Sequence, residues 1–255
     1  YIKNERLIKH TVSLLRKELG HSRDINLLDL ACGKGGDLYK WIRSNIKECV
    51  CFDISSDNIH NEKNGAIKRY RTLKEDGQRV PDIDFRVLDT SININETFED
   101  LIDKRFNIIT VMFALHYFFK DKTTLNGLID NIDQHIKSGG YFIGACFDGD
   151  IVYEKINHTD DGVLHFNLVD QTLLKIERMF LADKSFSNSE DSLGMGIDVE
   201  MYSIGSKHRE YLVNFDYFSD LLRERGIELV SKVNFRDILP LSIAEKKRMR
   251  LKPMN

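Results

Sequence analysis

The segment of residues 26–45, NLLDLACGKGGDLYKWIRSN, decides the fold because it joins a short apolar run to a glycine-rich turn and then to a helical pattern. The run at 26–30 is apolar on both sides and too short for a helix, which is typical of a strand buried in a parallel sheet. Gly33, Gly35 and Gly36 permit positive φ and a close approach of the backbone to a ligand. Asp37 then opens a helix whose first N–H groups point back toward the turn. The segment predicts a strand, a turn that binds something polar, and a helix.

An acidic residue follows this turn at the spacing that a nucleoside site requires. Asp53 ends the next apolar run, ECVCFDIS, 20 residues after Gly33. A nucleotide-binding βαβ unit places a carboxylate at about this distance to bind ribose hydroxyls. The dinucleotide signature GxGxxG is missing, because Ala31, Gly33 and Gly35 give AxGxG. We interpret the turn as the adenosine-binding turn of a methyltransferase; the alternative is a glycine-rich turn without a ligand.

Composition restricts the classes of protein and of partner. With 255 residues, 42% of them hydrophobic and 10% aromatic, the chain can build the core of one large α/β domain. A net charge of −3 argues against a general nucleic-acid coat, so any RNA contact must be local. The sequence has no signal peptide or long apolar span, which predicts a soluble intracellular protein without a membrane partner. Cys49 and Cys51 lack a second ligand pair, so we expect reduced thiols and no metal.

Strand-like and helix-like segments alternate along the chain, as a doubly wound parallel sheet requires. We expect strands at residues 26–30, 49–53, 84–88, 106–113, 141–147 and 228–235. We expect helices at residues 2–19, 37–44, 56–74, 122–135, 169–178 and 216–225. Residues 148–207, rich in Asp, Ser, Asn and Gly, interrupt this rhythm and are expected to form a substrate-binding insertion. The prediction is a single Rossmann-like α/β domain over residues 1–255, with a mostly parallel sheet, helices on both faces and the insertion within it.

Two further segments place polar or aromatic groups at strand ends. Asp89 ends the predicted strand in FRVLDTS and could accept a hydrogen bond from an adenine amino group, although many such aspartates are only turn residues. In TVMFALHYFFKD, a strand leads directly into His116, Tyr117, Phe118 and Phe119. Aromatic faces can stack on a base, and imidazole and phenol can contact its edge. We expect His116 and Tyr117 to bind a base and the two phenylalanines to hold the loop through burial.

Four segments together resemble the messenger RNA cap guanine-N7 methyltransferases, in particular the methyltransferase domain of capping enzymes from large cytoplasmic DNA viruses. They are LLDLACGKGGDLYKW, CFDIS, FALHYFF and REYLVNFDYFSDLLRERGIELV, and the similarity runs from residue 1 to about residue 235. The resemblance implies S-adenosylmethionine as methyl donor, S-adenosylhomocysteine as product and 5′-capped RNA as substrate. It also implies that the guanylyltransferase and triphosphatase parts of a capping enzyme belong to the same longer chain. A viral enzyme would act in the host cytoplasm or the virion, and a cellular one in the nucleus.

The resemblance assigns a cofactor role to seven residues. Lys9 and Asp37 would contact the amino-acid end of S-adenosylmethionine, with a solvated helix face as the alternative for Lys9. Asp53 would bind the ribose and Asp89 the adenine. The full implied cofactor site is Lys9, Ala31, Gly33, Asp37, Asp53, Asp89 and Met112.

The resemblance also implies a cap site. Lys34, in the glycine turn, would face the cap phosphates. His116, Tyr117 and Glu210 would hold the guanine, and Tyr211, next to Glu210, is a supporting candidate. Glu210 would select guanine by accepting hydrogen bonds from N1–H and N2–H2, which adenine cannot supply.

Three features depart from the family pattern. Ala31 stands where the first glycine is usual, and Met112 stands where a glutamine is common. Alanine still fits a tight turn. The sequence after residue 235 offers no final antiparallel strand, and its basic run is either a solvated helix face or a guide for an RNA backbone. That run comprises Lys246, Lys247, Arg248, Arg250 and Lys252.

The implied reaction requires alignment of guanine N7 with the methyl group of the sulfonium rather than a catalytic residue. Guanine N7 has a free lone pair and no proton at neutral pH, and the sulfonium is already reactive, so neither a general base nor a metal is required. Proximity of the reactants can contribute ~7–11 kcal/mol. Two alternatives remain: a methyltransferase that acts on a small molecule or a protein, and a catalytically silent methyltransferase-like module that binds RNA or a partner.

Overall fold

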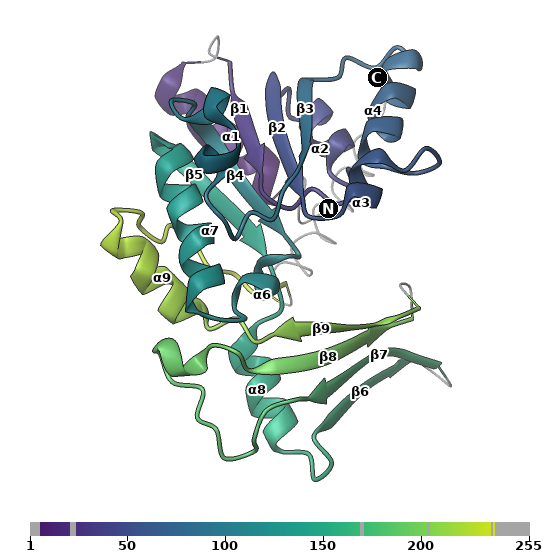
Figure 1. Cartoon of the computed structure of the whole chain (residues 1–255), viewed down its shortest axis with the longest axis vertical. Helices are drawn as coiled ribbons and strands as arrows, with labels where there is room; N and C mark the ends of the chain where they lie inside the picture. The colour runs from purple at the N-terminus through teal and green to yellow at the C-terminus, as the bar shows by residue number, and fades with distance from the viewer. Residues whose placement is uncertain (1–5, 21–23, 169–170, 203–204, 236, 238–255) are drawn as a thin grey trace, which may run out of the picture.

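Two β-sheets organise the chain (Figure 1), for which a computed structural model describes residues 6–20, 24–168, 171–202, 205–235 and 237. The larger sheet has the strand order β3-β2-β1-β4-β5, and every neighbouring pair is parallel. Its strands are β1 (Asn26–Asp29), β2 (Glu48–Asp53), β3 (Asp82–Val87), β4 (Phe106–Met112) and β5 (Ile136–Ala145). The predicted parallel sheet is confirmed, with the first strand at its centre.

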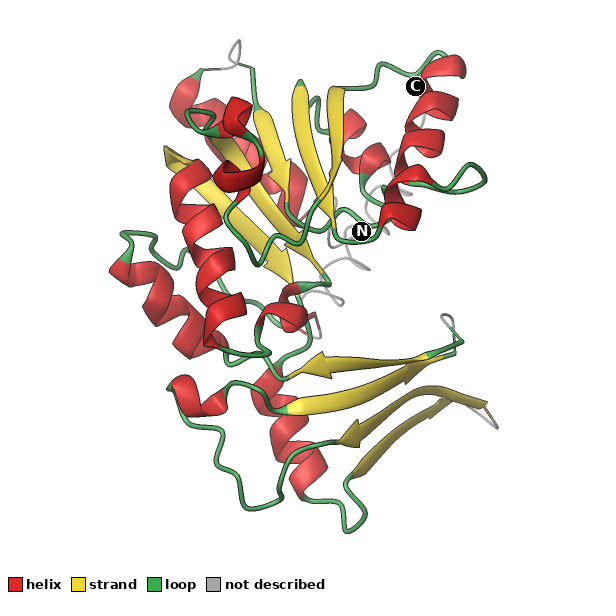
Figure 2. Ribbon diagram, in the orientation of Figure 1, coloured by secondary structure: helices red, strands yellow, loops and turns green. Residues whose placement is uncertain are grey.

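Helices cover both faces of this sheet (Figure 2). The long ones are α1 (Lys9–Leu19), α4 (Ala66–Glu75), α7 (Lys122–His135) and α9 (Phe215–Glu224). The short ones are α2 (Leu38–Arg43), α3 (Ser56–His60), α5 (Ile94–Thr97) and α6 (Leu115–Phe118). Alternate residues of each strand pack into two different hydrophobic cores, one on each face of the sheet, because successive side chains of a strand point to opposite faces. Leu28 and Ile109 join one cluster with α7 and α9, whereas Leu27 and Ile108 join the other with α1 and α4.

The second sheet is antiparallel, in the order β6-β7-β8-β9, and lies opposite the carboxyl edge of the parallel sheet (Figure 1). Its strands are β6 (Val163–Leu168), β7 (Gln171–Arg178), β8 (Gly196–Met201) and β9 (Lys207–Tyr211). Helix α8 (Gly149–Asn157) covers one face and buries Ile156 against Ile176 and Val199. The other face carries cross-strand ion pairs, among them Lys207 with Glu177. Residues 148–207, for which an insertion was expected, fold into α8 and β6–β8, and β9 extends this region to Tyr211; a role in substrate binding stays a prediction.

The chain enters this region through residues 146–148 and leaves it through residues 212–214. These two connecting segments, called the crossings below, are in contact. A Cβ added to Gly149 would lie only 2.2 Å from the backbone oxygen of Val213. Asp148 caps α8 by accepting a hydrogen bond from the backbone N–H of Ile151 at 3.2 Å. A residue larger than glycine at position 149 would force the two crossings apart.

Two predicted elements are wrong. Residues 171–178, expected in a helix from 169 to 178, form strand β7; residues 169–170 lie outside the described part. The apolar residues Leu174 and Ile176 face α8 as alternate positions of a strand, so pairing with β8 decided the structure. Residues 228–235 form no strand, and Val230 is 72% exposed. Side-chain contacts hold that segment instead, for example an ion pair between Nζ of Lys232 and Oδ1 of Asp216 at 3.3 Å.

Two predicted helices differ in their limits. The helix expected at 56–74 is divided into α3 and α4, because the chain turns between Asn61 and Gly65, where a Cβ would clash with the backbone of Asn61. The helix expected at 2–19 is described from residue 6, with α1 beginning at Lys9, and residues 1–5 lie outside the described part. The basic run at 246–252 also lies outside it. No helix among the described residues has the length and apolar character needed to cross a bilayer.

Candidate active site

The glycine turn after β1 has one open side and one packed side. Gly33 and Gly35 adopt φ values of 55° and 72°, in the left-handed region that glycine tolerates best. A Cβ on Gly33 would meet nothing within 4 Å, whereas a Cβ on Gly35 would lie 2.9 Å from Cδ1 of Leu38. Glycine at position 35 is therefore favoured by its positive φ and by the nearby Leu38, and Gly33 leaves backbone accessible to a ligand.

Asp53 links this turn to the end of β2. Its Oδ2 accepts a hydrogen bond from the N–H of Gly33 at 2.8 Å. Its Oδ1 accepts from the N–H of Ser55 and from Nδ2 of Asn58, each at 2.9 Å. A carboxylate offers about four acceptor positions. Asp53 thus positions the glycine turn and keeps acceptor capacity for a hydroxyl group.

Asp89 follows β3 and is exposed. Its Oδ1 accepts a hydrogen bond from the backbone N–H of Ser91 at 2.9 Å, so the turn role that is common for such aspartates is present here. The turn lies against α7, because a Cβ added to Gly127 would lie 1.7 Å from the backbone oxygen of Ser91. Helix α7 therefore supports the loop that carries Asp89.

Asn131 of α7 holds the same loop through three hydrogen bonds. Its fully buried amide donates to the backbone oxygens of Thr90 and Ile92 at 2.9 and 2.7 Å, and its Oδ1 accepts from the N–H of Ile94 at 2.9 Å. The Thr90 hydroxyl donates to the backbone oxygen of Leu30 at 2.8 Å, next to the glycine turn. Sequence reasoning did not identify Asn131, because an asparagine inside a helical pattern carries no local signal of these distant partners.

His116 and Glu210 meet where α6 approaches β9. Nδ1 of His116 lies 3.6 Å from Oε2 of Glu210, and the two residues are only 6% and 8% exposed. Within the described chain, Nε2 of His116 and Oε2 of Glu210 are both buried without a hydrogen-bond partner. Burial lowers the pKa of His116 to about 4 and raises the pKa of Glu210 to about 7. These two atoms keep hydrogen-bonding capacity that a polar ligand or a water molecule can use.

Tyr117 lies beside this pair and remains 49% exposed. Its ring centroid is 4.2 Å from that of His116, in an edge contact. Burial raises the pKa of the Tyr117 phenol, and the nearby charges of Glu210 and Asp53 raise it further. The pKa of the Tyr117 phenol thus responds to two carboxylates, Asp53, expected at the ribose, and Glu210, expected at the guanine. Phe118 and Phe119 are buried, which confirms the packing role expected for them.

The other two residues of the implied cap site point elsewhere. Nζ of Lys34 donates hydrogen bonds to Asp57 at 3.0 Å and to Asn64 at 2.9 Å. Tyr211 packs against the core of the parallel sheet. Adjacent strand residues point to opposite faces, so the Tyr211 side chain faces away from the Glu210 side of β9. The structure does not bring Tyr211 to the His116–Glu210 pair.

The remaining residues of the implied cofactor site have varied surroundings. Ala31 follows β1, and its N–H donates to Asp29 Oδ1 at 3.1 Å. Met112 is the buried last residue of β4, the neighbouring strand. Asp37 is buried before α2 and pairs with Lys40 at 2.7 Å. Lys9 is the exposed first residue of α1. Ala31 and Met112 thus lie at the carboxyl edge with Gly33.

The thiols and carboxylates that the structure describes form no metal site. No group of three or more His, Cys, Asp or Glu side chains in the described ranges is arranged to hold a metal ion. Cys49 and Cys51 are buried free thiols on β2, and burial raises the pKa of both well above its ordinary value. Such thiols are protonated and inert at neutral pH.

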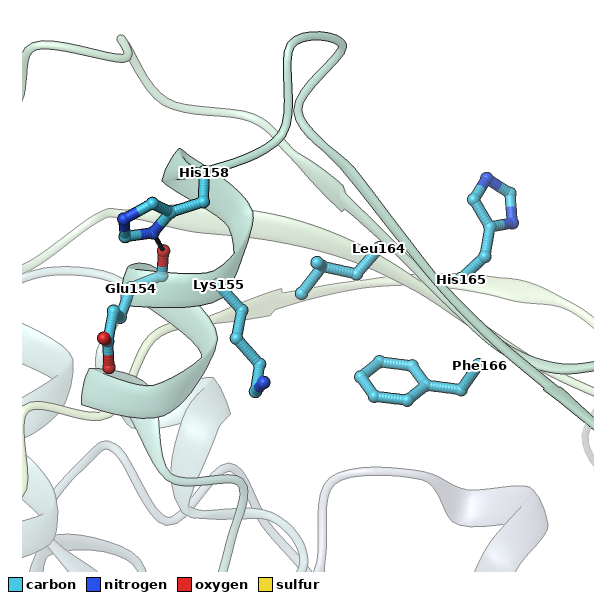
Figure 3. A pocket seen from close by; sticks show the side chains of 6 residues that line it. All are labelled: Glu154, Lys155, His158, Leu164, His165 and Phe166. Atoms are coloured by element: carbon cyan, nitrogen blue, oxygen red, sulfur yellow. Dashed lines mark hydrogen bonds between the residues drawn. The ribbon is translucent and has the colours of Figure 1, made fainter.

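A separate groove lies between α8 and β6 (Figure 3). It measures about 600 Å³ and contains none of the predicted site residues. The residues that line it are Glu154, Lys155, His158, Leu164, His165 and Phe166. The imidazole of His158 is hydrogen-bonded to α8, with Nδ1 2.6 Å from the backbone oxygen of Glu154.

Comparison with known proteins places the chain in a family of cap-modifying enzymes. A sequence model described as the mRNA (guanine-N(7))-methyltransferase domain matches residues 2–255. The probable mRNA-capping enzyme of Acanthamoeba polyphaga mimivirus is 27% identical over 235 residues, 83% of this chain and 20% of that protein. The mRNA cap guanine-N(7) methyltransferase of Caenorhabditis briggsae is 27% identical over 214 residues, 84% of this chain and 53% of that protein. The chain thus spans between a fifth and about half of the length of these relatives.

The fold is shared with solved methyltransferases. A structure of a S-adenosylmethionine-dependent methyltransferase from Clostridium acetobutylicum superposes with a TM-score of 0.55 at 18% identity, over 92% of this chain and 87% of that one. This likeness confirms the class I methyltransferase fold. Because the family match extends over almost the whole sequence, the chain belongs to the mRNA (guanine-N(7))-methyltransferase domain family.

Proposed function

We propose that this chain methylates N7 of the guanine in the 5′ cap of RNA, with S-adenosylmethionine as the methyl donor. The observation that carries the proposal is the buried pair of His116 and Glu210, whose Nε2 and Oε2 have no partner among the described residues. Membership of the guanine-N7 methyltransferase domain family supports the same reaction.

The pair suits the edge of a guanine. An ionised Glu210 accepts hydrogen bonds from N1–H and N2–H2, whereas adenine has no hydrogen at N1. His116 is neutral at pH 7, because burial lowers its pKa to about 4. Its Nε2, which has no partner among the described residues, is available for a hydrogen bond to the edge of the base. Tyr117, half exposed beside His116, presents its ring to the same base.

The residues near the glycine turn suit the methyl donor. Gly33 leaves its backbone open, Asp53 keeps acceptor capacity for a ribose hydroxyl, and Asp89 lies at the neighbouring strand end. When bound, S-adenosylmethionine supplies an electrophilic methyl group: the N7 lone pair forms the new C–N bond, and the S–C bond breaks to leave a neutral thioether. The protein holds the acceptor, excludes water and aligns the groups. No side chain takes a proton, because N7 carries none.

The setting of the reaction is also proposed. The mimivirus relative is named a probable mRNA-capping enzyme, and this chain matches only 20% of it. By analogy, we propose that the chain is the methyltransferase part of a longer capping enzyme that also carries guanylyltransferase and triphosphatase parts. A viral enzyme of this kind would act on transcripts in the host cytoplasm.

Methyl transfer to a defined cap tests the proposal. The chain is incubated with labelled S-adenosylmethionine and RNA that carries an unmethylated GpppN end, and nuclease digestion then identifies the methylated nucleotide. We expect label in N7-methylguanine from this RNA and none from the same RNA with an ApppN end. Equal transfer to both ends would contradict guanine recognition by Glu210. RNA binding without any transfer would favour the catalytically silent module instead.

Replacement of Asp53 by alanine is expected to abolish most of the rise in melting temperature that S-adenosylhomocysteine produces in the parent protein. The variant loses an acceptor for the ribose and the hydrogen bond that positions Gly33. Thermal shift and calorimetry measure the effect. Asp82→Ala, at the exposed amino end of β3, serves as the control and should keep the full shift. Unchanged affinity in the Asp53 variant would contradict the placement of the ribose.

The rate on capped RNA is expected to rise with pH. Glu210 must be ionised to accept hydrogen bonds, and its pKa in the free protein is raised to about 7. Therefore kcat/KM should increase over about one unit on either side of pH 7 and then level off, because kcat/KM reports groups of the free enzyme. Glu210→Gln should remove this rise from whatever activity remains. A flat profile in the parent protein would show that Glu210 does not control acceptor binding.

A further inference from the structure

Helix α4 presents a row of cations to solvent. Lys68, Arg71 and Lys74 are spaced three residues apart and are all exposed, whereas Ala66 and Leu73 face the core. Side chains at this spacing are neighbours on a helix surface, and like charges there repel each other and destabilise the helix. An anionic partner bound along this face would relieve the repulsion.

The cations of the row have no partner in the described part of the chain. Among the described residues, the charged groups of Lys68, Arg71 and Lys74 form no ion pair or hydrogen bond, whereas on the second sheet Lys207 pairs with Glu177. Helix α4 itself contains four Lys or Arg and one Glu, although the whole chain carries a net charge of −3. Positive charge is therefore concentrated on α4, as expected of a local nucleic-acid contact.

The row begins beside the glycine turn. Nζ of Lys34 bonds to Asn64 at 2.9 Å, and a Cβ on Gly35 would lie 3.4 Å from Cα of Ala66, the first residue of α4. In Figure 1 the α3–α4 connection lies at the end of the parallel-sheet part that faces the second sheet. A groove of about 360 Å³ between α3 and α4 is lined by Lys68 and Arg71 together with one acidic residue, Glu62, and with His60, Asn61 and Ile67. The cations thus continue from the carboxyl edge, where the cap site is proposed.

We propose that Lys68, Arg71 and Lys74 bind the phosphate backbone of the RNA that follows the cap. This inference rests on the proposed function, and it assigns the RNA body, not the cap, to α4. Three residues of an α-helix rise about 4.5 Å along its axis, so the row can follow several consecutive phosphates of a single strand. Contact with phosphates adds affinity without sequence preference and makes that affinity depend on salt.

The test compares a cap dinucleotide, GpppG, with a capped RNA of about twenty nucleotides. The variant Lys68→Ser/Arg71→Ser/Lys74→Ser is measured against the parent and against Lys17→Ser/Arg43→Ser/Lys155→Ser, which removes equal charge from exposed positions on α1, α2 and α8. We expect the α4 variant to methylate GpppG like the parent but to show a KM for capped RNA roughly tenfold higher. The slope of log KM against log salt should fall by about 2, since each single-strand phosphate contributes about 0.7. The control should match the parent.

The outcomes separate this inference from the proposed function. If the parent protein methylates neither GpppG nor capped RNA, the proposed function fails and the RNA path on α4 fails with it. If the parent methylates both and the α4 variant keeps the KM and the salt slope for capped RNA, only the path on α4 is overturned. Equal losses in the α4 variant and the control variant would also overturn it, because the effect would then come from net charge. Loss of GpppG turnover in the α4 variant alone would place these cations at the cap itself and contradict the assignment to the RNA body.

Discussion

Replacement of Glu210 by glutamine is expected to lower kcat/KM for capped RNA roughly 10- to 100-fold and to leave the affinity for S-adenosylhomocysteine unchanged. A hydrogen bond to a charged group contributes about 1.5–3 kcal/mol, and glutamine also turns a donor toward the guanine donors. Asp53 and Gly33 bond to each other without Glu210, so the proposed donor site should stay intact. Steady-state kinetics with capped RNA and calorimetry with S-adenosylhomocysteine measure the two effects separately.

The same variant should be more stable than the parent protein at pH 8 when no ligand is bound. The pKa of Glu210 is raised from 4.5 to about 7 in the folded chain, so ionisation of this buried carboxyl above pH 7 opposes folding. The gain in melting temperature should disappear below about pH 4.5, where the carboxyl is protonated in both states. Glu200→Gln, at an exposed position on β8, is the control and should change neither kcat/KM nor stability. Full turnover of capped RNA by Glu210→Gln would overturn the role of Glu210 as the guanine acceptor.

Replacement of Gly127 by alanine is expected to lower the melting temperature by about 2–12 °C and to weaken the binding of S-adenosylhomocysteine. The added methyl group would lie 1.7 Å from the backbone oxygen of Ser91, so α7 or the loop after Asp89 must move. Overpacking of this kind costs about 1–3 kcal/mol, and each kcal/mol shifts the melting temperature by about 2–4 °C for a chain of this size. Thermal melts and calorimetry measure the two effects.

The comparison variant for Gly127 is Thr123→Ala, an exposed substitution on the same helix that should change neither quantity. An unchanged melting temperature in Gly127→Ala would show that the loop adapts without cost. A lower melting temperature with full affinity for S-adenosylhomocysteine would instead contradict the assignment of the Asp89 loop to the adenine site.

The elements that sequence reasoning placed correctly carry strong local signals. Strands β1, β2 and β4 are buried apolar runs, and only a sheet covered on both faces accommodates them. Helix α7 has the limits expected from its sequence, because Asp121 and Thr124 form a reciprocal capping box at its start. Local chemistry was sufficient for each of these elements.

The second sheet was not predicted, because its strands depend on partners far along the chain. In QTLLKIER, Leu174 and Ile176 alternate with Lys175 and Glu177, but the same letters also suit an amphipathic helix turn. Pairing of β7 with β8, about twenty residues later, selects the strand. The segment 228–235 shows the reverse case, because its apolar residues predicted a strand and the structure has none there.

The residues of the candidate site also fall into two groups, those that the sequence alone could identify and those that only the folded structure reveals. Asp53 and Asp89 are recognisable as acids at strand ends, and parallel strands end at one edge of a sheet. The burial of Glu210 beside His116, and the engagement of Lys34 by Asp57, arise only when segments distant in sequence meet. Asn131 belongs to this second group, since its three partners are backbone groups about 40 residues earlier.

The contact between Gly149 and Val213 has a mechanical consequence. The two chain crossings lie side by side, so the polypeptide joins the two sheets at one narrow place. Contacts away from these crossings also hold the second sheet in place, because the N–H of Gly194 donates to the backbone oxygen of Phe119 at 2.9 Å and Lys122 pairs with Glu190 at 2.6 Å. The position of Glu210 on β9 relative to His116 on α6 therefore depends on these contacts, whereas Gly33 and Asp53 are held together within the parallel-sheet part. The geometry of the acceptor pair and that of the donor site thus rest on different parts of the chain.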